Sequence, residues 1–482
     1  MSARAVGAEN GAVRAIAARF FVVSSRIAER APLGLIITVI VLMGLLPGLV
    51  DAPPVLVRSG ILVVATILSW ATGIFAESIA SLLFFLLAAV FALAKPPVIF
   101  SGFATPAWWL VFGGAVTTVA VERTGLARRL ASALFGRLAA SYRLSLAAVS
   151  IGALALAFVM PSSTARVMIL IPIVLAFADR LGLEPGRSGR TGLVMTAAAV
   201  STLPAAAILP SNVSNLVLLG AADTLYGIKI TYGSYLLVHF PVLGLLKTLL
   251  LIETSYRLFP EPHRLQAVPP RPSAPMSPDE RVVAVVLAVS LLLFVTDVVH
   301  GISPAWVALG AGLICLLPGV GPLSVKSLSE VNLGLLIYVA GILGVGAVIA
   351  DSGLGTVLSR QLLRLSGIVP GHDAVNIVII MAIFSVIGLL TTLIGLPVVL
   401  APLAGDFATA SGLPVLTVLM LQVVIFSVPF LPYQNFIIVI GMQYGDVSLR
   451  RGVRFCLIQA VLTILVLFPL DYAWWRVLGY LQ

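Results

Sequence analysis

The chain has very little charge for its length. Of its 482 residues only 10% are Asp, Glu, Lys or Arg, whereas 60% are hydrophobic. A soluble protein of this size needs far more charge to cover its surface, so the composition argues strongly against that class. The apolar residues lie in many runs of about 20, the length that a helix needs to cross a bilayer. The sequence therefore predicts an all-α polytopic membrane protein.

Cysteine and histidine are also scarce. The two cysteines, Cys315 and Cys456, lie inside apolar segments and predict no disulfide framework. The four histidines are scattered over loops and helix ends: His239, His263, His300 and His372. They lack the spacing of a metal site, and no paired carboxylates accompany them. We predict that the protein is not an enzyme and has no cofactor or metal site, with Na+ as a coupling ion left open.

The formal charge of +10 is an orientation signal, because the basic residues gather in alternate loops. By the positive-inside rule one set is cytoplasmic: the N-terminus, 123–143, 180–190, 257–281, Lys326 and 450–454. This distribution argues against a nucleic-acid partner. Lys247 lies toward the cytoplasmic end of an apolar segment, where snorkelling is expected. Arg166 lies within another apolar segment.

The apolar segments predict about eleven transmembrane helices and two re-entrant hairpins. The expected spans are 33–50, 59–75, 78–94, 105–121, 191–225, 232–254, 282–299, 304–318, 331–350, 411–442 and 453–472. The hairpins are 144–178 and 375–408, where polar residues and Pro interrupt the apolar runs. An odd number of spans places the C-terminus outside.

The chain divides at a segment rich in proline. We predict a cytoplasmic N-terminal segment at 1–30, a first repeat at 31–258, a cytoplasmic linker at 259–280 and a second repeat at 281–482. Residues 1–30 show no cleavable signal and read as an interfacial helix; a mitochondrial presequence is the alternative.

Each half shows the same order of features. The first has Ser162-Ser163-Thr164-Ala165 followed by Pro172, then a helix interrupted at 210–215. The second has Thr391-Thr392 followed by Pro402, then a helix interrupted at 429–435. The basic residues assign opposite orientations to the halves. This pattern predicts inverted-topology repeats, typical of secondary transporters with a midplane site.

The interruptions predict an anion site. Half-helix N-termini present free backbone N–H groups and a partial positive charge, and the hydroxyls and amides nearby add donors. A Ser/Thr cluster alone more often caps a helix, but two matched pairs of breaks favour a site. The predicted substrate-binding residues are Ser162, Ser163, Thr164, Arg166, Asn215, Thr391, Thr392 and Asn435.

This arrangement resembles the divalent anion/Na+ symporter (DASS) family, over roughly residues 33–475. Hairpin tips of that family carry Ser-Asn-Thr, and its broken helices carry Thr-Pro-Pro-Asn. Ser162-Ser163-Thr164 matches the first tip, Thr392-Leu393-Ile394 diverges from the second, and Asn215 and Asn435 fit the ends of the broken-helix motifs. The resemblance implies a scaffold and a transport domain, a homodimer, elevator-type alternating access and carriage of a dicarboxylate, citrate or sulfate.

The departures from the family pattern weaken the prediction of sodium coupling. Both central Asn residues of the tips are replaced, which removes oxygen ligands. The residues left for ion coupling are Ser162, Ser163, Ser211, Asn212, Thr392 and Pro432. Arg166 could supply a permanent charge for the anion, or it could snorkel or pair structurally. Tyr433-Gln434 could replace lost substrate contacts.

We therefore predict a secondary active anion transporter in a bacterial cytoplasmic membrane, with a small anion and lipid as partners. The alternative is a cation/proton antiporter of a related fold. That function needs a midplane carboxylate that cycles through protonation, and none stands out in the sequence.

Overall fold

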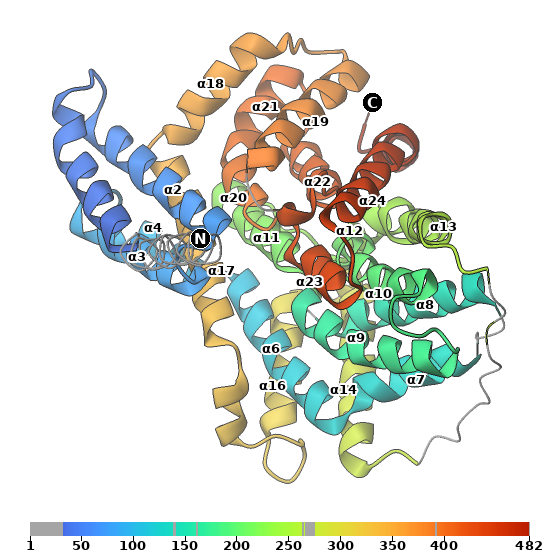
Figure 1. The fold of residues 1–482 in the computed structure, drawn as a ribbon. Helices are drawn as coiled ribbons and strands as arrows, with labels where there is room; N and C mark the ends of the chain where they lie inside the picture. Colours follow the sequence, from blue (N-terminus) through green and yellow to red (C-terminus); the bar gives the residue numbers. More distant parts are fainter. Residues whose placement is uncertain are drawn as a thin grey trace, which may run out of the picture.

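The computed structural model describes residues 32–481 except 138–140, 161, 263–264, 266–274 and 391–392. The regular elements of these residues are all helical (Figure 1). The first half contains Pro32–Gly48, α2 (Pro54–Thr72), α3 (Glu77–Val90), α4 (Pro96–Ile99), α5 (Ser101–Ala104), α6 (Pro106–Thr124), α7 (Leu126–Arg137), α8 (Tyr142–Val159), α9 (Ser163–Arg180), α10 (Ser188–Val200), α11 (Val213–Tyr226), α12 (Tyr232–His239) and α13 (Lys247–Leu258).

The second half contains α14 (Pro278–Val295), α15 (Asp297–His300), α16 (Pro304–Leu316), α17 (Leu333–Asp351), α18 (Leu354–Ser366), α19 (Asp373–Leu390), α20 (Leu396–Leu400), α21 (Ala404–Ser411), α22 (Val415–Phe426), α23 (Phe436–Tyr444), α24 (Leu449–Leu462) and α25 (Phe468–Val477). Two π-helical segments, η4 (Phe240–Leu246) and η8 (Thr463–Leu467), join α12 to α13 and α24 to α25. The all-helical fold class is confirmed.

Five helical segments of the described chain are long and apolar enough to cross a membrane. They are Pro54–Thr72, Tyr142–Val159, Tyr232–Leu258, Leu333–Asp351 and Leu449–Val477, and shorter apolar helices accompany them. Every span expected from the sequence overlaps a described helix. The count of eleven spans and the inverted orientation of the halves stay predictions.

Two helices were missed in the sequence. The sequence pattern places residues 123–143 in a basic loop and leaves residues 351–374 between the expected span 331–350 and the hairpin 375–408. The structure forms α7 in the first of these segments and α18 in the second. Each begins just after a glycine in the left-handed conformation, Gly125 at φ 77° and Gly353 at φ 76°. Their basic residues alternate with apolar ones, so the charges hid an amphipathic helical period.

The expected breaks are present. In the first hairpin α8 ends at its C-cap Met160 and α9 begins at its N-cap Ser162. Two short 3-10 turns, η2 (Pro204–Ala207) and η3 (Leu209–Ser211), separate α10 from α11. In the second half η7 (Pro432–Gln434) separates α22 from α23. Proline explains these interruptions, because it lacks the N–H that a continuous helix needs. Asn212 and Asn435 then start the second half-helices as N-caps.

The broken helices of the two halves interlock in the middle of the molecule (Figure 1). α10 packs against α23, and α11 packs against α17 and α22. Outside this centre α6 lies along α16, where a Cβ at Gly113 would overlap the backbone of Ala308. Small residues that allow such close backbone approach are typical of helix pairs in membranes.

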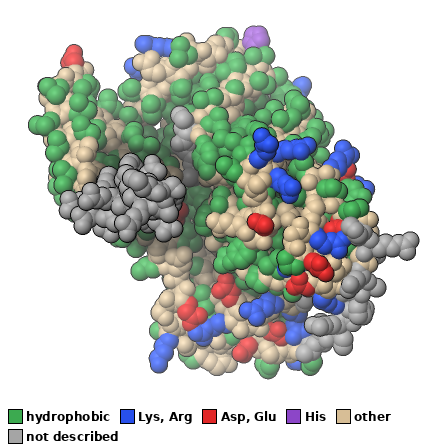
Figure 2. Space-filling view, viewed as in Figure 1, with side chains coloured by type: hydrophobic (Ala, Val, Ile, Leu, Met, Phe, Trp, Pro, Cys, Tyr) green, Lys and Arg blue, Asp and Glu red, His purple; other side chains and the backbone are tan. Residues whose placement is uncertain are grey.

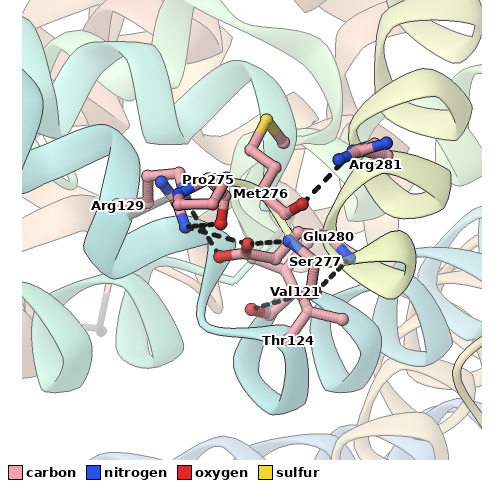
Figure 3. Close-up of polar contacts among 8 residues, drawn as sticks. All are labelled: Val121, Thr124, Arg129, Pro275, Met276, Ser277, Glu280 and Arg281. Carbon is pink, nitrogen blue, oxygen red and sulfur yellow. Dashed lines mark hydrogen bonds and ion pairs between the residues drawn. The ribbon is translucent and has the colours of Figure 1, made fainter. Parts of the chain in front are cut away.

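Both described ends of the proline-rich linker are anchored. Glu261 accepts from Arg187 at 2.6 Å. At the other end Ser277 and Glu280 form a capping box that starts α14. Arg129 of α7 donates to both carboxylate oxygens of Glu280 at 3.0 Å and to the carbonyl of Pro275 (Figure 3). The linker therefore joins the first half through specific ion pairs.

Charged side chains are unevenly distributed over the surface. Figure 2 shows apolar side chains over much of the visible face and more frequent charges along its lower right edge. Many large apolar side chains are exposed, such as Leu86, Leu292 and Leu465. Exposed leucines on apolar helices fit contact with lipid chains.

Candidate functional site

The first hairpin tip lies at the N-terminus of α9. The Ser162 hydroxyl caps the helix by accepting from the Ala165 N–H at 3.2 Å. Ser163 is buried, and its hydroxyl donates to the Ser211 carbonyl at 3.4 Å, while Thr164 is exposed. The tip therefore reaches the break between α10 and α11.

Arg166 is enclosed by the protein, with none of its surface exposed. One terminal nitrogen donates to the carbonyls of Met160 and, at 3.0 Å, Ser211. The other donates to the Ser163 hydroxyl at 3.0 Å and to the Ser201 carbonyl at 2.5 Å. The snorkelling alternative is therefore wrong, because the guanidinium turns inward and joins three segments.

The charge of Arg166 has no described counterion. The acceptors of its hydrogen bonds are neutral carbonyl and hydroxyl oxygens, and no described carboxylate forms an ion pair with it. Burying a cation is costly unless its donors are satisfied, and the four contacts use both terminal nitrogens of Arg166, while its Nε has no hydrogen-bond partner among the described residues. The hydrogen bonds therefore offset part of the desolvation cost and leave a positive charge between the tip and the first break.

At the first break, side chains form hydrogen bonds with backbone groups that the interrupted helix leaves without helical partners. The Ser211 hydroxyl donates to the Ala205 carbonyl, and Asn212 caps α11 by accepting from the Asn215 N–H at 3.0 Å. The Asn215 amide donates to Ala206 and Ile208 carbonyls at 3.0 and 2.8 Å. Its Oδ1 is buried and has no hydrogen-bond partner in the described parts of the chain.

The second hairpin tip contacts both broken helices. Thr391 and Thr392 lie outside the described residues, but Leu393 follows them directly. Its N–H donates to the Gln434 carbonyl at 3.1 Å, and its carbonyl accepts from the Ser214 hydroxyl at 3.1 Å. The tip thus bridges the start of α11 and the break before α23.

Residues Pro432 to Gln434 form the turn η7, with Pro432 and Gln434 buried and Tyr433 exposed. The Gln434 side chain accepts from Phe430 and Leu431 N–H groups at 2.8 Å and donates to the Gly388 carbonyl at 2.7 Å. Its amide is therefore committed to backbone groups. The Tyr433 hydroxyl donates to the Leu389 carbonyl at 2.6 Å.

Asn435 connects the two breaks directly. Its Nδ2 donates to the Thr202 hydroxyl at 3.0 Å, and its Oδ1 accepts from the Ile437 N–H at 3.1 Å. Thr202 follows Ser201, the C-cap of α10 that binds Arg166. The structure thus brings Ser163, Arg166 and Ser211 into direct contact and reaches Asn435 through Ser201-Thr202.

Sequence reasoning missed Ser201, Thr202 and Ser214 as members of this network. The hydroxyl pair Ser201-Thr202 stands just before Pro204, at the end of an apolar run. That position repeats the polar-then-proline signal of the other breaks and would have found both residues.

A family model described as "Sodium:sulfate symporter transmembrane region" matches residues 27–481. The chain belongs to this family. Members share a membrane environment and a small-molecule substrate, so the expected family and the expected partners of those two classes are confirmed.

Two relatives agree with a membrane protein. A protein named "Membrane protein" from Cupriavidus necator is 26% identical over 298 residues, which are 60% of this chain and 57% of that protein, so the match spans little more than half of its length. "Inner membrane protein YbhI" of Escherichia coli K12 is 26% identical over 419 residues, 80% of this chain and 83% of that protein.

A solved structure supports the fold. The YdaH transporter of Alcanivorax borkumensis superposes with a TM-score of 0.56 at 15% identity, over 80% of this chain and 88% of that chain. At that identity the likeness concerns the fold alone. The hydrogen-bonded centre of tips and breaks is where the described chain brings several of the residues predicted from the sequence together.

Proposed function

We propose that this protein is a secondary active transporter of small di- or trivalent anions, such as a dicarboxylate, citrate or sulfate. The observation that carries the proposal is the buried charge of Arg166 without a described counterion, next to the N-termini of α9 and α11. A fixed positive charge and two helix N-termini favour an anion at the same place. The family membership supports carriage of an anion.

The anion would lie against the polar ends of the broken helices. Its ligands in this proposal are Ser162, Ser163 and Thr164 of the first tip, Thr391 and Thr392 of the second, and Asn435. Asn215 instead holds the first break, because both hydrogens of its amide are used on carbonyls. The donors of Arg166 are largely used on carbonyls, so this residue acts through its charge. This differs from the direct contact with the substrate that the sequence analysis predicts for Arg166.

We further propose that transport is independent of sodium. Unwound carbonyls and half-helix C-termini are the groups that coordinate Na+ in transporters with broken helices. In this chain the carbonyls of Ser201 and Ser211 accept from Arg166. The Arg166 guanidinium occupies these oxygens with a cation that is part of the protein. Fewer oxygens of Ser163, Ser211 and Asn212 are then free to coordinate Na+.

The remaining parts of the proposal follow the family and the relatives. They are a homodimer, elevator-type alternating access and residence in a bacterial inner membrane, the last in line with the name of the Escherichia coli relative. The N-terminus would be cytoplasmic and the C-terminus outside.

The test is uptake of labelled succinate, citrate and sulfate into proteoliposomes, with and without a sodium gradient. We expect saturable, sodium-independent uptake by wild type and its loss in Arg166→Gln. Arg166→Lys should keep part of the uptake, because the charge remains. Arg143→Gln is the matched control, since Arg143 is an exposed partner of Glu253.

Sodium-dependent uptake that Arg166→Gln leaves intact would contradict both the charge and the coupling proposals. Uptake of none of the three anions by wild type would contradict the substrate class. Size-exclusion profiles of each variant separate a lost charge from a lost fold.

A further inference from the structure

A second buried cation, Lys247, lies at the other break, and a buried acid, Asp471, lies in the same region. Lys247 is 1% exposed, and its ammonium donates to the carbonyl of Ser427 at 2.6 Å and to the hydroxyl of Ser427 at 3.0 Å. Ser427 is the C-cap of α22, at the start of the second break. The snorkelling expected for Lys247 is therefore wrong. Its position mirrors Arg166, which binds the C-cap of α10 at the first break.

Asp471 in the first turn of α25 is the acidic member of the pair. It is 4% exposed, and neither carboxyl oxygen has a hydrogen-bond partner among the residues that the structure describes. Lys247 is the charged side chain whose field reaches it, but the described residues contain no ion pair between them. An ionised carboxylate buried with no hydrogen bond is far more costly than a neutral acid. The geometry therefore accommodates Asp471 in its protonated form.

Asp471 also lines a cavity of about 530 Å³ between α19, α22, η8 and α25. Most of the lining is apolar, including Met381, Val424 and Trp475. A bound water molecule needs about 10–15 Å³ and roughly two to four polar partners, and Ser385, Asp471 and Tyr472 supply polar groups in the cavity wall. The carboxyl is thus both buried from bulk solvent and adjacent to space through which a proton can reach it.

Few other titratable or charged groups stand on the elements around Asp471. They are Lys247 on α13, Tyr232, Tyr235 and His239 on α12, Tyr472 and Arg476 on α25, and Asp373 at the start of α19. The other such groups of α13, Glu253, Tyr256 and Arg257, lie toward its C-terminal end, where Glu253 pairs with Arg143 and Arg257. The segments η4, η8 and α22 contribute none. His239 packs its ring 5.7 Å from Trp475 and contacts Met420 through Nε2. Lys247 is therefore the group that a change of charge on Asp471 affects most.

The local backbone supports a functional role. Lys247 follows the π-helical segment η4, and Asp471 lies just after the π-helical segment η8. The two segments pack against each other. π-Helical turns are rare and occur frequently at functional sites. Both members of the pair are thus placed by the same uncommon structure in corresponding regions of the two halves.

We propose that Asp471 is a proton-binding site whose charge controls Lys247. With Asp471 protonated, Lys247 stays on Ser427 and holds the end of α22. Loss of the proton to water in the cavity leaves a carboxylate that draws the Lys247 ammonium away from Ser427 and frees the second break. The coupling of this switch to anion movement rests on the proposed transport function, whereas proton binding does not.

The first test is infrared difference spectroscopy of the purified protein in lipid nanodiscs as the pH is varied. We expect a protonated-carboxyl C=O band that disappears on raising the pH and is missing in Asp471→Asn. Asp406→Asn is the matched control, because Asp406 is half-buried and accepts from Ser359. A wild type without a titrating band, or a band that Asp471→Asn retains, would overturn the proton site.

The second test is uptake of succinate, citrate and sulfate with and without a proton gradient. The gradient should change wild-type and Asp406→Asn uptake several-fold and leave Asp471→Asn and Lys247→Met unaffected, with the band kept in Lys247→Met. Equal gradient effects in wild type and Asp471→Asn would overturn the coupling. A titrating band in a protein that carries none of the anions would support the proton site and contradict the proposed function.

Discussion

The two breaks of this transporter handle a buried cation in opposite ways. At the first, Arg166 donates to four oxygens from three segments and stays where the backbone places it. At the second, Lys247 donates to Ser427 alone within the described part of the chain, and the Asp471 carboxyl has no hydrogen-bond partner there. A guanidinium whose two terminal nitrogens are held by four oxygens is a fixed structural charge. An ammonium with one partner and a nearby unpaired acid is suited to change position.

The chemistry of the two side chains fits this division. Arg presents a planar fork that matches several acceptors at once and keeps its charge under all ordinary conditions. Lys is a compact charge on a flexible stem with rotatable donors. The same fold position, the C-cap at the start of a break, can therefore serve as an anchor in one half and as a switch in the other.

The largest effect is expected from Arg166→Met. Loss of the guanidinium leaves the carbonyls of Met160, Ser201 and Ser211 without this donor, at roughly 1–3 kcal/mol for each buried acceptor left unsatisfied. We expect a loss of free energy of unfolding on the order of 3 kcal/mol or more, measured by denaturation in mild detergent. A loss below that of Lys247→Met would reverse the assignment of anchor and switch.

The next effect concerns the bond that joins the two breaks. Asn435→Ala removes both the hydrogen bond to Thr202 and the cap on Ile437. We expect a loss of about 1–2 kcal/mol, since a cap and a neutral hydrogen bond each contribute about 1 kcal/mol. A double-mutant cycle with Thr202→Val should give a coupling of about 1 kcal/mol. Additive losses would show that the breaks are energetically independent.

Lys247→Met should change stability far less than Arg166→Met. It removes two bonds to Ser427 but also a buried charge, and replacing buried charges with apolar groups is often neutral, so we expect a change within about 1 kcal/mol. Thermal unfolding of both variants in the same detergent measures the contrast. A collapse of the Lys247→Met fold would make this residue a second anchor.

Much of this architecture could be predicted from the sequence, because hydrophobic runs and proline positions act locally. The interruptions at Ser162, Pro210 and Pro432 located both broken helices and the first tip. The partners of Arg166 could not be predicted, because they depend on packing. The sequence allows this residue to face an anion, to snorkel or to pair structurally, and only the structure shows that it binds carbonyls from distant turns. Asp471 escaped notice near the end of the span expected at 453–472, where an acid usually meets water.

The smallest effect is expected at the linker, remote from both breaks. The hydrogen bond from Arg129, together with the Ser277 N–H, lowers the pKa of Glu280. Since the folded-state pKa is the lower one, the stabilisation is present above the unfolded-state pKa and is lost as the pH falls through the folded-state pKa. Glu280→Gln should remove this acid sensitivity and leave anion uptake unchanged.

Thermal unfolding over an acid pH series measures the effect, with Glu253→Gln as the control. Glu253 pairs with Arg143 and Arg257 at an exposed position, where ion pairs contribute about 0–1 kcal/mol. If Glu280→Gln abolished uptake while Glu253→Gln did not, the linker would have to transmit force between the halves. Transport would then depend on the linker as well as on the two breaks. The connection would run through Arg129 on α7, which binds Glu280 at the start of α14 and belongs to the half that contains Arg166.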